Sequence, residues 1–165
     1  MTSQGEAVQD YYPSDYAHCY GCGRLNEHGL HVKSVWQGDE VVARFQPEPY
    51  HVAVPGFVYG GLLASLVDCH AMATAAATAE RAAGRGIGER EAPRYVTGSL
   101  RVDYLRPTPL GPELELHARV RESNERTATV EVTVRVQGTM TARGQVVAVR
   151  LPETMSSSGR AGGAA

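Results

Sequence analysis

A long run of mostly apolar residues extends from Val54 to Ala79, VPGFVYGGLLASLVDCHAMATAAATA, and limits the folds open to this chain. Its Ala, Leu and Met residues favour a helix. They fall on every face of that helix, which is typical of a helix buried on all sides. The run is too interrupted and too rich in alanine for a membrane span. We therefore expect one buried central helix that starts near Tyr59 and ends near Gly84, a glycine suited to a helix C-cap.

The rest of the chain predicts antiparallel strands around this helix. A turn signal at Gly38-Asp39 separates two short strands over 30–36 and 40–46. After the helix, apolar and polar side chains alternate over four further segments, near 100–104, 114–121, 130–136 and 141–151. A helix that is apolar all round must be enclosed by other elements. The sequence thus predicts an α+β fold, in which one antiparallel sheet of about six strands wraps around one long central helix.

Length and composition bound the organisation of the chain. With 165 residues it is long enough for a single domain with its own core, which we expect at 18–152. Residues 1–17 are polar with interspersed tyrosines and are expected to form an N-terminal arm. The Ser-, Gly- and Ala-rich residues 153–165 are expected to be a disordered tail. The charged, Gly-rich stretch 85–93 is expected to be a mobile surface loop.

Charge and cysteine content exclude several classes of function. The chain has 16 basic and 18 acidic residues and a net charge of -2, so nothing indicates a general nucleic-acid or membrane-surface binder. No apolar stretch follows a basic start, as a secretory signal would require. The three cysteines are an odd number and are typical of intracellular thiols rather than of a disulfide framework. These observations predict a cytoplasmic protein.

The predicted helix carries one carboxylate, Asp68, within its apolar surface. An ionisable group there is costly and indicates either a catalytic group or a carboxylate that pairs inside the fold. Burial would raise its pKa and make it a better base. Gly60 and Gly61 leave unpaired N–H groups at the helix start that suit a developing oxyanion, although such glycines also serve helix packing. His70 points about 200° around the helix from Asp68 and is expected to be a packed, hydrogen-bonded histidine.

The pair Cys19-x-x-Cys22 suggests a metal site, with His18, His28 or His31 as further ligands. A single CxxC is insufficient, because a structural zinc site needs four ligands and usually shows a second pair. A redox dithiol would need a βαβ context that the sequence lacks. We predict no metal and a packed structural turn here, with metal binding as the alternative.

Three motifs in the same order resemble the hotdog-fold acyl-CoA thioesterases of the PaaI type. They are HCYGCGRLNEHGL at 18–30, YGGLLASLVD at 59–68 and VDYLRPTPLG at 102–111. The first looks like the CxxCG…N…GL segment of one branch of that family. The chain departs from the family pattern at two positions, since Tyr59 replaces the usual His before the two glycines and Ala53 stands where several relatives have Asn.

The resemblance implies hydrolysis of an acyl-CoA thioester by a homodimer or a dimer of dimers. Asp68 would be the nucleophile or general base, the Gly61 N–H would donate to the oxyanion across the subunit interface, and Thr97 would orient the attacking water. No metal or organic cofactor is implied, because coenzyme A is part of the substrate, and neither nucleic acid nor membrane is an implied partner. His51 would replace the missing His or Asn. Four residues would contact the substrate: His51, Tyr59, Gly60 and Ser65.

Other interpretations stay open. A non-catalytic acyl-CoA binding module is favoured by the two replaced residues. A hotdog dehydratase or hydratase would need an acid and a histidine on one substrate carbon, and the closely spaced Asp…His signature of that branch is absent. Thr97 also fits a strand by propensity alone, and Tyr59 also fits a core. Several arginines near the helix end either bind the phosphates of coenzyme A or form a solvated surface: Arg81, Arg85, Arg90, Arg94 and Arg106.

Overall fold

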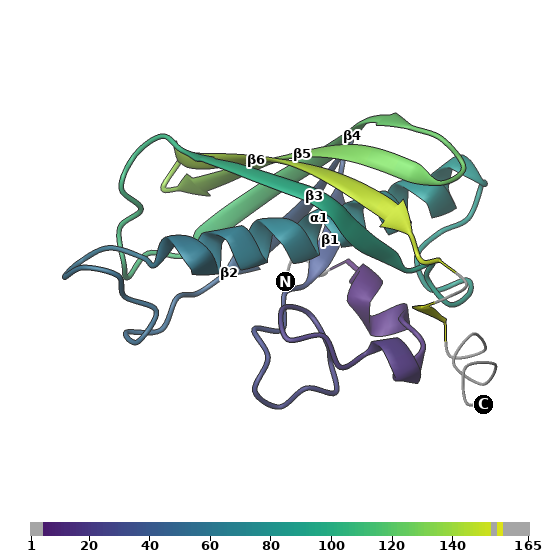
Figure 1. Cartoon of the computed structure of the whole chain (residues 1–165), viewed down its shortest axis with the longest axis horizontal. Coiled ribbons are helices and arrows are strands. Elements are labelled where there is room, and N and C mark those ends of the chain that lie inside the picture. Colours follow the sequence, from purple (N-terminus) through teal and green to yellow (C-terminus); the bar gives the residue numbers. More distant parts are fainter. Residues whose placement is uncertain (1–4, 153–154, 157–165) are drawn as a thin grey trace, which may run out of the picture.

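Helix α1 (Gly60–Ala82) crosses one face of a six-stranded antiparallel sheet. The computed structural model describes residues 5–152 and 155–156. Figure 1 shows the sheet on one side of α1 and the N-terminal segment, which includes the short 3-10 helices η1 (Val8–Tyr11) and η2 (Ser14–Tyr16), on the other. This arrangement confirms the predicted α+β architecture. The predicted tail lies outside the described residues, apart from Met155 and Ser156.

The strands are short before the helix and long after it: β1 (Ser34–Gln37), β2 (Glu40–Phe45), β3 (Tyr95–Tyr104), β4 (Leu114–Ser123), β5 (Thr127–Val136) and β6 (Thr139–Arg150). Their order across the sheet is β1-β2-β4-β5-β6-β3, so β3 lies at one edge. The predicted turn at Gly38-Asp39 joins β1 to β2. Gln137 and Gly138 join β5 to β6 with φ of 49° and 83°, the two positive values that a type I′ hairpin turn requires.

The first strand is shorter than predicted, because residues 30–33 pair with the preceding turn and not with β2. The Leu30 N–H donates to the Tyr20 carbonyl at 2.8 Å. The Val32 N–H donates to the Gly21 carbonyl at 3.0 Å. The alternating apolar residues in this segment therefore face the core as a strand would, while their backbone groups are satisfied elsewhere.

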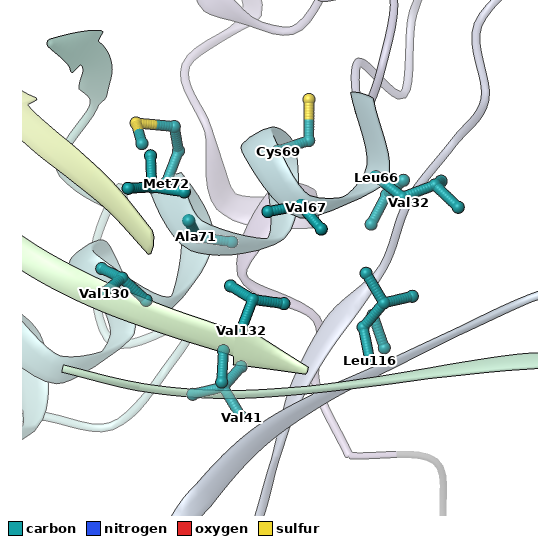
Figure 2. Close-up of a cluster of buried hydrophobic side chains, with 14 of the residues drawn as sticks. Val32, Val41, Leu66, Val67, Cys69, Ala71, Met72, Leu116, Val130 and Val132 are labelled. Carbon is teal, nitrogen blue, oxygen red and sulfur yellow. The ribbon is translucent and has the colours of Figure 1, made fainter. Parts of the chain in front are cut away.

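The apolar surface of α1 is covered on both sides. Val67 faces Val132 of β5, and the Cys69 sulfur points away from the sheet (Figure 2). Gly144 of β6 lies beneath the helix, where an added Cβ would be 2.4 Å from Cγ1 of Val67, so the helix and the sheet approach closely at a residue without a side chain. By length and composition alone α1 could cross a membrane, but 72% of its apolar window is buried within the fold, as in the core helix of a soluble protein.

The helix ends at the predicted C-cap region. Gly84 has φ of 73°, its N–H donates to the Arg81 carbonyl, and the Arg85 N–H donates to the Glu80 carbonyl; this is a Schellman motif. The Glu80 carboxylate, only 4% exposed, forms ion pairs with Arg85 and Arg90, each with a closest distance of 2.8 Å. The loop predicted to be mobile is thus attached to the helix end through two arginines.

A buried polar network connects the N-terminal segment to the helix. The Gln9 amide donates to Ser34 Oγ, and Ser34 Oγ lies 2.8 Å from His70 Nδ1. His70 Nε2 lies 3.1 Å from the Val41 carbonyl, so Nε2 carries the proton and Nδ1 accepts from Ser34. Burial lowers the pKa of His70 to about 4. The prediction of a packed, hydrogen-bonded histidine is confirmed.

Candidate functional site

The structure brings together two of the predicted site residues, Asp68 and Thr97. Thr97 Oγ1 donates a hydrogen bond to Asp68 Oδ1 at 2.5 Å. Asp68 is half-buried about two turns into α1, and Thr97 is exposed on the edge strand β3. The hydrogen bonds of the described residues leave Oδ2 of Asp68 without a donor. One carboxylate oxygen is therefore held in position, and the other is free to accept a proton from a water or to meet a substrate.

The surroundings of Asp68 raise the pKa of its carboxyl above the ordinary value. The main cause is burial of the carboxyl, which disfavours its charged form. The hydrogen bond from Thr97 and the positive charge of Arg94 act against it. A carboxylate whose pKa moves toward neutrality is a stronger general base than one on the surface. The structure therefore gives Asp68 an environment suited to proton transfer.

Strand β3 is irregular beside Thr97. The pairing of β3 with β6 shifts register between Thr97 and Ser99, so Gly98 forms a bulge. A Cβ at Gly98 would be 2.8 Å from Cγ2 of Val149, which favours glycine at this point. Bulges often re-aim a side chain next to a functional site. The single glycine within a strand pattern was the signal for this feature, and the sequence analysis did not use it.

The start of α1 forms a second group of predicted site residues. The N–H groups of Gly60 and Gly61 have no acceptor among the described residues, as expected in the first turn of a helix. An added Cβ at Gly61 would be 2.4 Å from the ring of Tyr59, so this exposed ring lies directly against Gly61. Tyr104, which the sequence analysis did not single out, donates from its hydroxyl to the Gly60 carbonyl at 2.7 Å. The helix start is thus a half-buried donor site flanked by two exposed tyrosines.

The two groups do not meet within one chain. Gly61 and Asp68 are seven positions apart on one straight helix, which separates them by about 10 Å along its axis. One thioester carbonyl cannot contact both groups of the same chain. One surface hollow lies elsewhere, on the outer face of the sheet between Arg101, Glu131 and Arg143.

The remaining predicted contacts have local roles in the structure. Ser65 Oγ donates to the Gly61 carbonyl at 2.9 Å, one turn back along the helix. His51 Nδ1 accepts from the Glu48 N–H at 2.9 Å, and the His51 carbonyl accepts from the Tyr59 N–H. His51 therefore contacts the residue before the two glycines through its backbone, while its imidazole stabilises a turn. Contacts of His51 and Ser65 with a substrate stay predictions.

Four of the five arginines considered for coenzyme A are engaged inside the chain. Arg85 and Arg90 pair with Glu80, as described above. The Arg81 guanidinium lies 3.3 Å from the centre of the Trp36 ring, and that of Arg94 lies 4.3 Å from the centre of the Tyr12 ring. Arg106 is exposed, and within the described part of the chain its guanidinium has no ion pair or hydrogen bond.

Comparison with known proteins gives consistent results for the middle of the chain. A family model described as "Thioesterase superfamily" matches residues 55–143. A solved thioesterase superfamily protein from Shewanella loihica is 41% identical, with coverage of 86% of this chain and 100% of that chain and a TM-score of 0.63. The phenylacetic acid degradation protein PaaI from Thermus thermophilus, solved as a mutant, is 29% identical over 74% of this chain and 95% of that chain, with a TM-score of 0.56.

A curated relative carries a named activity. Acyl-coenzyme A thioesterase THEM4 from Xenopus laevis is 32% identical over 95 residues, which are 58% of this chain. The chain spans 37% of the length of that protein.

Proposed function

Because this chain belongs to the thioesterase superfamily and has its hotdog fold, we propose that it hydrolyses an acyl-CoA thioester to a free acid and coenzyme A. The observation that carries the proposal is the hydrogen-bonded pair of Asp68 and Thr97 on the central helix and the edge strand. The name of the curated relative supports the same substrate class.

In the proposed reaction Asp68 acts on the thioester carbon through a water or directly. As a general base, its free oxygen takes a proton from the water that attacks the carbonyl carbon. The C–S bond then breaks, and the proton passes to the departing thiolate of coenzyme A. As a nucleophile, the carboxylate would form a mixed anhydride that water hydrolyses in a second step. Thr97 holds the carboxylate in either case.

The oxyanion of the tetrahedral intermediate needs hydrogen-bond donors. The N–H of Gly61 is an available donor at a helix start, where the helix dipole also favours negative charge. We propose that it comes from a second copy of the chain in a homodimer or a dimer of dimers. The separation of about 10 Å between Gly61 and Asp68 along one helix supports this arrangement.

The edge strand β3 supports the same assembly. This ten-residue strand pairs with β6 on one side, and its other side is the edge of the sheet formed by the described residues. An unpaired edge of this length readily accepts another strand. Leu100 and Tyr104 on this strand are 40% and 53% exposed, although their alternation predicted a half-buried face. A second chain along β3 would cover these side chains and bring its own helix start toward Thr97.

The first experiment is release of free thiol from short, long and aromatic acyl-CoAs by the wild type and by Asp68→Asn. We expect turnover of at least one member, and a loss of 10²-fold or more in kcat in Asp68→Asn with coenzyme A ester binding retained. Asp39→Asn, the same change at an exposed turn residue, is the matched control and keeps full activity.

Equal activity in Asp68→Asn and the wild type would remove Asp68 from the mechanism. Absence of turnover across the panel, with acyl-CoA binding retained in calorimetry, would contradict hydrolysis and identify an acyl-CoA binding module.

A further inference from the structure

The three cysteines of the chain meet in one cluster between the N-terminal segment and α1. Cys19 and Cys22 come from the turn at residues 19–23, and Cys69 comes from the side of the helix that points away from the sheet (Figure 2). All three Sγ atoms lie within 4.8 Å of one another, and those of Cys19 and Cys69 are 3.7 Å apart. The sequence predicted His18, His28 or His31 as ligands to add to Cys19 and Cys22. It gave no sign of Cys69, which is 47 positions beyond Cys22 and has no partner at CxxC spacing.

The spacing of the sulfurs matches the geometry of a tetrahedral metal site. With a zinc–sulfur bond of about 2.3 Å, two thiolates on a tetrahedron are about 3.8 Å apart. The Sγ atoms of Cys19 and Cys69 are 3.7 Å apart, which is close to this value. The other separations are at most 4.8 Å and need a contraction of no more than about 1 Å.

The backbone around the cluster is shaped to admit the thiols. A Cβ on Gly21 would be 2.2 Å from Cys69 Sγ, so only glycine lets the turn and the helix approach this closely. A Cβ on Gly23 would be 2.4 Å from the Cys19 nitrogen, which keeps the turn tight.

The surroundings also match the charge of an occupied site. Three thiolates and one divalent ion together carry a charge of about -1. Arg94 is close enough to Cys22 to act on it electrostatically, and its guanidinium is held over the Tyr12 ring. A fixed positive charge beside the sulfurs offsets the net negative charge.

We propose that Cys19, Cys22 and Cys69 bind one thiophilic divalent metal ion of the zinc class, which ties the N-terminal turn to the central helix. Each thiol loses its proton to solvent as its metal–sulfur bond forms. The fourth tetrahedral position is left to a solvent molecule. The site lies beside Asp68 in sequence but takes no part in the proposed hydrolysis, so the two proposals succeed or fail separately.

The test uses the full-length chain, reduced and freed of metal, with Zn²⁺ and Co²⁺ as probes. We expect one Zn²⁺ per chain in a chelator competition and a sulfur-to-cobalt charge-transfer band with Co²⁺. Zn²⁺ should also protect all three thiols from a thiol reagent. Thermal unfolding should shift to higher temperature with Zn²⁺, because the ion binds the folded state.

Three variants separate the role of the sulfurs from that of the fold. Cys19→Ser changes the most exposed thiol of the three and should weaken Zn²⁺ binding by tenfold or more. Gly21→Ala keeps all three thiols but displaces Cys69, and it should weaken binding as well. Met72→Leu removes another buried sulfur from the same helix and should bind as the wild type does.

Failure of the reduced wild type to take up Zn²⁺ would overturn the proposal, and this measurement needs no variant to fold. Uptake that is unchanged in Cys19→Ser and Gly21→Ala would also overturn it. Air oxidation of two thiols to a disulfide, without metal uptake by the reduced chain, would identify a redox pair in place of a metal site.

Discussion

At the scale of single residues, the central feature is the hydroxyl of Thr97, which binds one oxygen of Asp68 and leaves the other free. A threonine in a strand is common for reasons of propensity. The contact with a half-buried carboxylate on another element distinguishes Thr97 from such a threonine. The bulge at Gly98 follows Thr97 directly on β3. Thr97 is therefore proposed to position the carboxylate and the water it activates.

Replacement of Thr97 tests this role. Thr97→Val keeps the shape of the side chain but removes the hydroxyl, so we expect kcat to fall by about tenfold to a hundredfold, while KM changes less. Thr97→Ser keeps the hydroxyl and should retain most of the activity. Steady-state kinetics on the best acyl-CoA measure both. Equal rates for the Val and Ser variants would show that the hydrogen bond is not used.

At the scale of elements, α1 is fixed by its end and by its contact with the sheet. Its C-terminal cap and the ion pairs of Glu80 hold the loop that leads to β3. Its middle rests on Gly144 of β6, where no side chain intervenes. Both features determine how Asp68 is presented to β3, because they set the position of the helix relative to that strand.

The Glu80 ion pairs predict an acid-dependent stability. Hydrogen bonds from Arg85 and then Arg90 lower the pKa of Glu80 from 4.5 to about 2. A carboxyl with a lowered pKa in the folded state contributes stability that is present above pH 4.5 and is lost as the pH falls through 4.5 toward 2. Glu80→Gln should therefore lower Tm at pH 7 and flatten the dependence of Tm on pH in this window.

The matched control is Glu125→Gln, at an exposed turn residue without an ion pair in the described part of the chain. It should leave both Tm and its pH dependence unchanged. A Glu80→Gln variant with the same acid profile as the wild type would contradict the assignment.

Because α1 lies close to β6 at Gly144, a side chain added there should clash with the helix. Gly144→Ala would bring a methyl group to 2.4 Å from Val67 Cγ1 and should lower the free energy of unfolding by about 1–3 kcal/mol. Val67→Ala in the same chain removes the opposing methyl groups. The free energy of unfolding of the double variant should therefore fall by less than the sum of the decreases in the two single variants. Denaturant unfolding of the four proteins measures the coupling, and additive losses would show that the two residues do not compete for space.

At the scale of the whole molecule, the proposed site is divided between two chains. Asp68 and Thr97 lie at one sheet edge, and the free N–H of Gly61 lies about two turns away on the same helix. Association along β3 would complete the site twice in a symmetric dimer, since each chain would contribute both halves to different sites. Only the assembled dimer would then be active.

Mixing two inactive variants tests the division. Gly61→Pro removes the N–H in the first helical turn, where proline is tolerated once the exposed Tyr59 ring moves aside. Asp68→Asn and Gly61→Pro should each be inactive as pure dimers. A mixed dimer restores one of its two sites, so an equal mixture that exchanges chains fully should recover about a quarter of the wild-type activity. Circular dichroism checks that both variants fold. A mixture as inactive as its components would show that each chain holds a complete site.

Much of this protein could be predicted from local patterns. The apolar run predicted the buried helix, Gly84 predicted its end, and the turn signal at Gly38-Asp39 predicted the first hairpin, because periodicity and turn chemistry act between near neighbours. The placement of Asp68 on a buried helix and of two glycines at its start followed from the same patterns. Those patterns also predicted six strands but not their order in the sheet.

The contacts between distant residues depend on how the whole chain packs. The pairing of β3 with β6 exposed Leu100 and brought Thr97 to Asp68, and the packing of the N-terminal turn on α1 brought Cys69 to Cys19. Residues 30–33 have the sequence pattern of a strand, but two of their backbone N–H groups donate to the preceding turn and not to β2. The physical reason is that periodicity fixes which face of an element is apolar, whereas long-range contacts depend on which faces the whole chain brings together, and no local spacing encodes that choice.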